Sequence, residues 1–280
     1  MSMSSAQQGG APVRRSSFLL LARSIWNNRR LVNELARREL TDLHAGQMGG
    51  FIWLLVHPLL MFAVYAVLFT FVFKVRVGEQ GPADYLVYLF SGLMPWLFTQ
   101  DVMTRSSSVM VANAAVVKKV QFPIETLVAK TLLAAMKVQC VLLVTVVIFT
   151  IVQRQTVPYS FLLLPVVIGL HLLIVWGIAL LLAAITPFLR DLTEVIRIFG
   201  MVNIYLMPVI YLPHMAPNLL KFVLVLNPFS HLIWCYQDVL YFGSIQHPWS
   251  WGVTAIMAAG LSTGGSMVFL RLRSYIANHI

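Results

Sequence analysis

Two adjacent lysines in a short break between apolar runs are the side chains of this chain best suited to docking a partner. The break, residues 113–125, reads NAAVVKKVQFPIE, and its Lys118 and Lys119 are costly to place in lipid. Their neighbours are too apolar for a solvated loop, and a proline closes the segment: Val116, Val117, Val120, Phe122 and Pro123. The pattern predicts a short amphipathic helix at a membrane surface, with something to dock against.

A second pair of charges is spaced to interact within the membrane. Asp101 and Arg105 stand one helical turn apart in the polar half of an otherwise apolar stretch. Mutual pairing would lower the cost of burying both charges, so we expect a buried ion pair. Direct contact of the two side chains with a transported molecule is the alternative.

Aromatic side chains form the third candidate site, a substrate pathway. One helical face carries aromatic residues at spacings of three, four and four, namely Phe62, Tyr65, Phe69 and Phe73. Others gather toward the outer half of the predicted molecule: Trp96, Tyr205, Tyr211, Trp234, Tyr236 and Tyr241. Such stripes are usually helix packing or an interfacial belt. A flat aromatic face also stacks on the apolar face of a sugar ring, so both interpretations stay open.

The sequence lacks the motifs of several enzyme classes. It has no G-x-x-x-x-G-K-[ST] loop to cradle phosphates, no H-E-x-x-H metal motif and no evident Ser, His and Asp set. Cys140 and Cys235 lie in apolar surroundings and are expected to be packing residues. We therefore expect no enzyme, and no cofactor or metal bound by this chain. Acidic residues such as Asp101 and Glu194 are too few for a proton or sodium carrier, so ATP and Mg²⁺ on a separate subunit would supply the energy.

Composition identifies the elements that must position these residues. The chain of 280 residues is 59% apolar and 11% charged, with a mean hydropathy of +0.81. A soluble domain carries about 25% charged residues, so this is an integral membrane protein. The net charge of +10 does not indicate nucleic acid, because the basic residues fall in gaps between apolar runs.

The fold class expected is all-α, with six transmembrane helices. A helix needs about 20 apolar residues to span a bilayer, and six stretches qualify: 51–73, 85–111, 127–152, 161–187, 192–212 and 250–270. Most of the 20 Lys and Arg residues then fall on one side. The positive-inside bias puts that side, both termini and the C-terminal tail 271–280 in the cytosol.

Two segments precede these spans. Residues 1–28 are expected to be a disordered cytosolic tail, followed by an amphipathic interface helix at 29–48. That helix is either a simple anchor or a gate formed by Arg37, Arg38 and Glu39, in which Glu39 intrudes on the apolar face and meets a partner.

The outer segment 214–245 is apolar but interrupted. Asn227 and Pro228 cut it into pieces of about 8 and 14 residues, each too short to cross a membrane. We expect a re-entrant pair of short helices that roofs a pathway, with Trp234 and Tyr236 in the roof.

Six motifs in order carry a resemblance to a known family: RELT followed by GGFIWLLVHPLL, then FSGLMPWLF, NAAVVKKVQFPIE, PFLRDL, MPVIYL and LNPFSHLI. From about Arg38 to the last span, the chain resembles the ABC-2 type permeases that export lipid-linked polysaccharides. That group includes the O-antigen, capsular polysaccharide and teichoic acid exporters. The sequence departs from the family before the first span, where Thr41, Leu43, His44 and Ala45 replace basic residues and a tyrosine.

The resemblance implies a homodimer paired with two copies of an ATP-binding subunit in the cell inner membrane. Residues 116–123 would sit in a cleft of the ATPase, with Arg190 and Asp191 in a second cytosolic turn. The first and fifth spans would border a lateral opening for the lipid anchor. The expected function is export of lipid-linked polysaccharide, O-antigen first. Capsular polysaccharide or teichoic acid export is the alternative, and an ABC-2 drug or lipid exporter or a membrane-embedded glycosyltransferase is more remote.

Overall fold

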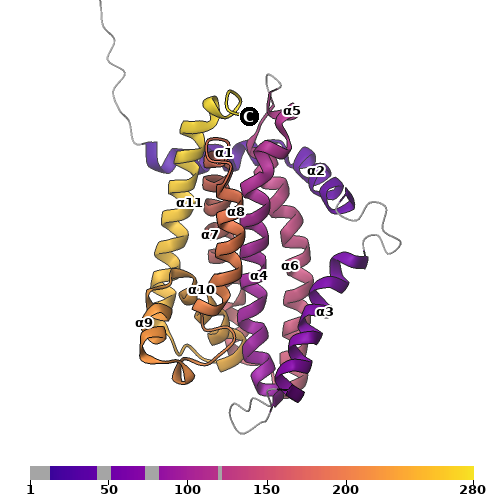
Figure 1. Cartoon of the computed structure of the whole chain (residues 1–280), viewed down its shortest axis with the longest axis vertical. Helices are drawn as coiled ribbons and strands as arrows, with labels where there is room; N and C mark the ends of the chain where they lie inside the picture. The colour runs from indigo at the N-terminus through magenta and orange to yellow at the C-terminus, as the bar shows by residue number, and fades with distance from the viewer. Residues whose placement is uncertain (1–12, 43–51, 73–81, 119–121) are drawn as a thin grey trace, which may run out of the picture.

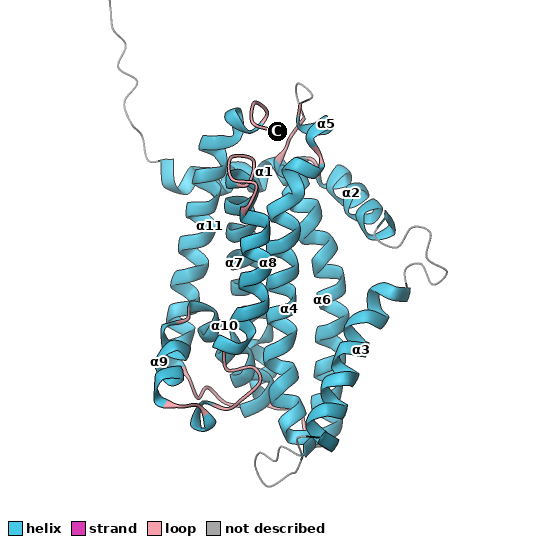
Figure 2. Ribbon diagram, viewed as in Figure 1, coloured by secondary structure: helices cyan, strands magenta, loops and turns pink. Residues whose placement is uncertain are grey.

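The computed structural model describes residues 13–42, 52–72, 82–118 and 122–280, and these contain helices and connecting loops but no strand (Figure 2). The first half comprises α1 (Val13–Asn27), α2 (Arg29–Asp42), α3 (Trp53–Val67) with a π-helical continuation (Leu68–Val72), α4 (Pro82–Ala112), α5 (Ala114–Val117) and α6 (Glu125–Arg154). The second half comprises a 3-10 turn (Tyr159–Leu163), α7 (Leu164–Ile185), α8 (Leu192–Asn203) with a 3-10 turn (Ile204–Leu206), a further 3-10 turn (Pro213–Met215), α9 (Asn218–Leu226), α10 (Pro228–Gln237) with a π-helical continuation (Asp238–Phe242), and α11 (Pro248–Ile276).

The long helices α4, α6, α7 and α11 run side by side as a bundle (Figure 1). Among the described residues, three helical stretches are long and apolar enough to cross a membrane: Glu125–Arg154, Tyr159–Ile185 and Pro248–Ile276. A fourth crossing is reached if the bent pair of α9 and α10 counts as one span. The all-helical membrane architecture is confirmed, whereas the count of six spans stays a prediction.

The helical part of the predicted fifth span is shorter than expected. Helix α8 and its 3-10 turn stop at Leu206, and Met207 is extended with φ −131° and ψ 158°. The reason is local, because a residue that precedes a proline is driven out of the helical region, and Pro208 follows Met207. The apolar run 192–212 therefore ends in irregular backbone rather than in a full-length helix.

The break at Asn227 and Pro228 is confirmed. Asn227 is extended, with φ −74° and ψ 115°, and α9 and α10 meet there at a bend of 90°. Pro228 occupies the first position of α10, where its missing N–H breaks no helical hydrogen bond.

The expected disordered tail needs a correction, because Val13–Asn27 forms α1. This helix owes its place to packing: Leu21 is buried in the same cluster as Phe269 and Ile276 of α11. Helices α1 and α2 lie across one end of the bundle, the end that also carries α5 and the C-terminus (Figure 1). A helix is present over Arg29–Asp42, its place in a membrane interface stays a prediction, and the predicted extension to 48 falls outside the described residues.

Helices α7 and α11 cross at close range through glycines. A Cβ on Gly177 would overlap the backbone of Leu261, and a Cβ on Gly265 would overlap the carbonyl of Gly177. Small residues let membrane helices approach until their backbones touch, and this contact holds α11 against the centre of the bundle.

Candidate functional site

A cluster of charges fastens the interface helix α2 to the bundle. Glu39 places one carboxylate oxygen 3.7 Å from Nη1 of Arg105 on α4 and the other 3.4 Å from Nζ of Lys130 on α6. Nε of Arg105 donates to Asp101 Oδ1 at 2.7 Å. We call these residues, with Asn113, the Glu39 cluster. The ion pair of Asp101 and Arg105 is therefore present, but their side chains are 38% and 24% exposed, so it is half-buried rather than buried.

The side chains that pair with Glu39, those of Arg105 and Lys130, belong to this chain and not to another subunit. Its side chain is 17% exposed and that of Lys130 is 13% exposed, so the pair is largely shielded from solvent. By contrast, Arg37 and Arg38 point outward, and Arg38 pairs with Glu34 at 3.5 Å where both are about two-thirds exposed or more. Exposed pairs of that kind contribute about 0 to 1 kcal/mol, so among the charged residues of α2 Glu39 makes the better-shielded contact, beside the buried apolar side chains of Ala36 and Leu40.

The Glu39 cluster reaches the predicted docking segment through Asn113. Nζ of Lys130 donates to Asn113 Oδ1 at 3.4 Å, and Asn113 immediately precedes α5. Its Nδ2 also donates to the carbonyl of Val109 at 2.7 Å, which fixes the side chain at the end of α4. The first residue of the 113–125 break is thus linked to the interface helix.

Helix α5 itself is only one turn long, Ala114–Val117. Val117 is buried, Val116, Phe122 and Pro123 are half-buried, and Lys118 is exposed. Lys119 and Val120 fall outside the described residues. The described part of the break therefore has the predicted amphipathic character, with an apolar side on the bundle and a lysine facing out.

The last residue of the break, Glu125, fastens the first helix. Its carboxylate accepts a hydrogen bond from Ser24 Oγ of α1 at 2.5 Å and lies 3.5 Å from Nη1 of Arg273 on α11. The Glu125 side chain is 2% exposed. The break is consequently tied to α2 through Asn113 at its start and to α1 through Glu125 at its end.

Arg190 and Asp191 lie in the turn between α7 and α8, at the same end of the bundle (Figure 1). Both are exposed, and their contact with a partner stays a prediction. Within the described residues no ion pair to either side chain is found.

The aromatic stripe of α3 packs largely against α4. Phe62 stacks on Phe90 with ring centroids 4.4 Å apart and planes at 8°, and Phe69 lies 5.1 Å from Tyr85. Tyr65 is half-buried, and Phe73 falls outside the described residues. For Phe62 and Phe69 the geometry favours the packing alternative.

The outer aromatic residues are also largely interior. Trp96 is buried, with its ring 5.5 Å from that of Phe229. The Tyr211 hydroxyl donates to the carbonyl of Tyr205 at 2.6 Å, and Tyr205 is exposed. The ring of Trp234 stacks on that of His247, with the ring centroids 5.2 Å apart.

Buried polar contacts hold Tyr236, in the roof, and Tyr241, in the outer half of the molecule. The Tyr236 hydroxyl lies 3.0 Å from Nδ1 of His171, whose Nε2 lies 2.8 Å from the hydroxyl of Thr99. Tyr241 donates to Asp84 Oδ2 at 2.9 Å. These two tyrosines join helices to one another rather than lining an open path.

Asn227 joins the two parts of the outer segment. Its Oδ1 accepts a hydrogen bond from the N–H of Phe229 at 3.1 Å and so caps α10. Its Nδ2 donates to Asn203 Oδ1 at 2.8 Å and to the carbonyl of Leu206 at 3.0 Å. The roof is therefore attached to the end of α8.

Comparison with known proteins identifies the family. The family model described as ABC-2 type transporter matches residues 30–241. The chain belongs to the ABC-2 type transporter family. The match begins in α2 and includes the Glu39 cluster, the 113–125 break and Asn227.

Three curated relatives of this ABC-2 type transporter chain carry the name O-antigen export system permease protein RfbA. Two come from Klebsiella pneumoniae: one is 25% identical over 76% of this chain and 81% of the relative, and the other is 23% identical over 85% and 90%. The third, from Myxococcus xanthus, is 25% identical over 80% of this chain and 85% of the relative.

Sequence reasoning missed the role of Glu125 in this ABC-2 type transporter. The available signal was an acidic residue directly before the long apolar run of α6, a position where a carboxylate needs a partner. Within the described residues, no group of three or more His, Cys, Asp or Glu is arranged to hold a metal ion. Cys140 and Cys235 are not joined by a disulfide.

Proposed function

We propose that this chain is the membrane-spanning subunit of an ATP-driven exporter that moves lipid-linked O-antigen polysaccharide outward across the cytoplasmic membrane. The observation that carries the proposal is that three relatives, each aligned over most of its length, bear the name of O-antigen export permeases. Capsular polysaccharide and teichoic acid remain alternatives of the same class, whereas all three of these relatives are named for O-antigen export.

The proposed energy source is a separate ATP-binding subunit, present in two copies, which would bind ATP and Mg²⁺. Lys118 and the turn at Arg190 and Asp191 would contact it, since both are exposed at one end of the bundle. A push on α5 would be transmitted inward because Val117 is buried in the bundle and Glu125 begins α6. We place this end in the cytosol, together with both termini.

The proposed assembly is a homodimer, with α3 and α8 near the lateral opening. Exposed apolar side chains occur on both helices, among them Leu60 and Val64 on α3 and Ile198 and Val202 on α8. A second copy or lipid would cover these faces. Tyr65 and Tyr205 are not fully buried and would be the aromatic residues available to a sugar chain.

The docking surface is tested by co-expressing the chain with the ATP-binding subunit proposed as its partner. A variant carrying Lys118→Glu and Phe122→Asp should insert normally but lose co-purification of the ATPase and surface O-antigen. Lys221→Glu, an exposed lysine on α9 far from this end, is the matched control and should retain both. Unchanged export in the double variant would sink the docking proposal. Normal O-antigen at the surface of a strain lacking the chain would sink the transport proposal.

A further inference from the structure

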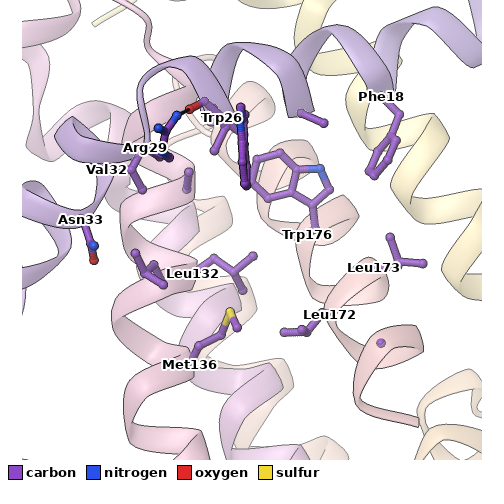
Figure 3. A pocket seen from close by; sticks show the side chains of 15 residues that line it. Phe18, Trp26, Arg29, Val32, Asn33, Leu132, Met136, Leu172, Leu173 and Trp176 are labelled. Carbon is purple, nitrogen blue, oxygen red and sulfur yellow. Dashed lines mark hydrogen bonds between the residues drawn. The ribbon is translucent and has the colours of Figure 1, made fainter. Parts of the chain in front are cut away.

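A groove lined mainly by apolar side chains lies between the N-terminal helices and the bundle (Figure 3). Phe18 and Trp26 of α1 enclose it from above, Leu132 and Met136 of α6 form one wall, and Leu172 and Trp176 of α7 form the other. Its volume of about 570 Å³ falls among those of small-molecule sites, which run from about 300 to 1,000 Å³.

One of the residues that line the groove is a glycine, Gly169. A Cβ added to Gly169 on α7 would meet no atom within 4 Å, in contrast to the tightly packed Gly177 two turns further along the helix. Because Gly169 also lines the groove, a larger residue at 169 would take up groove space without displacing the backbone.

A cationic pocket adjoins the groove. It has a volume of about 430 Å³, shares Asn33 with the groove and is lined by Arg30, Arg37 and Lys137. Within the described part of the chain, none of these three cations forms an ion pair, and Glu34, which also lines the pocket, is paired with Arg38 at 3.5 Å. Three cations with one shared acid would attract a negatively charged group.

The apolar groove beside unpaired cations is complementary to an amphipathic molecule that has an apolar chain and a negatively charged headgroup. An acyl chain gains free energy in the groove as it would in the bilayer, and an anionic headgroup gains about 1 kcal/mol from each nearby Lys or Arg. We propose that the groove binds one acyl chain of an anionic glycerophospholipid, with its phosphate among Arg30, Arg37 and Lys137. The lipid fills the space under α1 and α2, a role independent of the transported cargo.

The test uses the full-length chain purified in detergent and incubated with phosphatidylglycerol or phosphatidylcholine. Native mass spectrometry counts the lipid molecules that remain bound. Gly169→Phe should abolish retention of phosphatidylglycerol by filling the groove. Arg30→Gln with Lys137→Gln should weaken it about 30-fold, about fivefold for each lost charge.

Two matched controls separate the site from general effects. Gly260→Phe makes the same substitution on α11, where a Cβ also meets open space and the residue does not line the groove, and Arg38→Gln removes a charge on α2 that is already paired. Both should retain phosphatidylglycerol. Circular dichroism of each variant checks the helical fold.

Equal retention of both lipids by the unaltered chain would overturn the proposal. So would retention that survives Gly169→Phe, because the charges alone would then account for binding. Preferential capture of a polyprenyl phosphate would assign the groove to a cargo carrier instead and overturn the phospholipid assignment. Each result is read from binding alone, so failure here leaves the transport proposal standing.

Discussion

Neutralising Glu39 should release the interface helix from the bundle. Glu39→Gln keeps the shape of the side chain but removes the charge that faces Arg105 at 3.7 Å and Lys130 at 3.4 Å. We expect a less stable protein in which α2 separates from α4 and α6 more readily.

The magnitude follows from distance and shielding. At an effective dielectric constant of about 20, each contact carries a gross attraction of about 4 to 5 kcal/mol. Arg105 keeps Asp101 and Lys130 keeps Asn113 after the substitution, so neither cation is left without a partner. Breaking a fully buried pair costs about 3 to 5 kcal/mol and breaking an exposed pair costs under about 1 kcal/mol. We therefore expect Glu39→Gln to lower the free energy of unfolding by about 2 kcal/mol.

The assay is thermal unfolding of the full-length chain in detergent. A loss of that size should lower the melting temperature by about 4 to 8 °C. Glu34→Gln is the matched control, because it removes the same charge from the same helix, but Glu34 pairs with Arg38 where both are highly exposed. An exposed i,i+4 pair of this kind contributes about 0.3 to 0.5 kcal/mol, so the melting temperature of Glu34→Gln should change by less than about 2 °C.

A double-mutant cycle then tests the contact directly. Combining Glu39→Gln with Lys130→Met should show a coupling energy of about 1 kcal/mol, because each substitution removes the same interaction. Additive effects of the two substitutions, or equal shifts for Glu39→Gln and Glu34→Gln, would refute the reasoning that the cluster holds α2.

Three further outcomes follow from the packing. Gly265→Leu should destabilise the protein by about 3 kcal/mol or more in chemical denaturation, because the new side chain would meet backbone atoms of α7. The control, Gly264→Leu, lies next to it in open space and should change stability by under about 0.5 kcal/mol. Equal effects of the two substitutions would contradict the close crossing of α7 and α11. Asn227→Ala removes a cap and two hydrogen bonds and should cost about 2 kcal/mol by the same measurement, so an unchanged midpoint would contradict the capping role. Tyr236→Phe deprives the buried His171 of a partner and should cost about 1 to 2 kcal/mol, which an unaltered melting temperature would disprove.

Local rules predicted those parts of the fold that depend on local chemistry. The break at Asn227 and Pro228 was predictable because proline acts on its immediate neighbours. The same rule, applied at Pro208, would have shortened the predicted helix of the fifth span. Apolar length alone was a poor guide there, since irregular backbone is also apolar when it packs within the protein.

Helix α1 and the partners of Glu39 could not be predicted in the same way. The apolar run of α1 is short, and its Leu21 is buried only because α11 lies beside it. Helical periodicity put Glu39 on the apolar face and so predicted that it needs a partner. Its partners, Arg105 and Lys130, come from helices far along the chain, and only the tertiary arrangement of α4 and α6 identifies them.

The two N-terminal helices and the 113–125 break are joined in a way that constrains any motion between them. The Glu39 cluster links α2 to the start of the break at Asn113, while Ser24 links α1 to its end at Glu125. A displacement of α5 relative to the bundle must therefore either break these contacts or carry both interface helices with it. The side chains of Glu39, Lys130 and Glu125, which make these contacts, are at most 17% exposed. A force applied at Lys118 would accordingly reach the end of the bundle across which α1 and α2 lie.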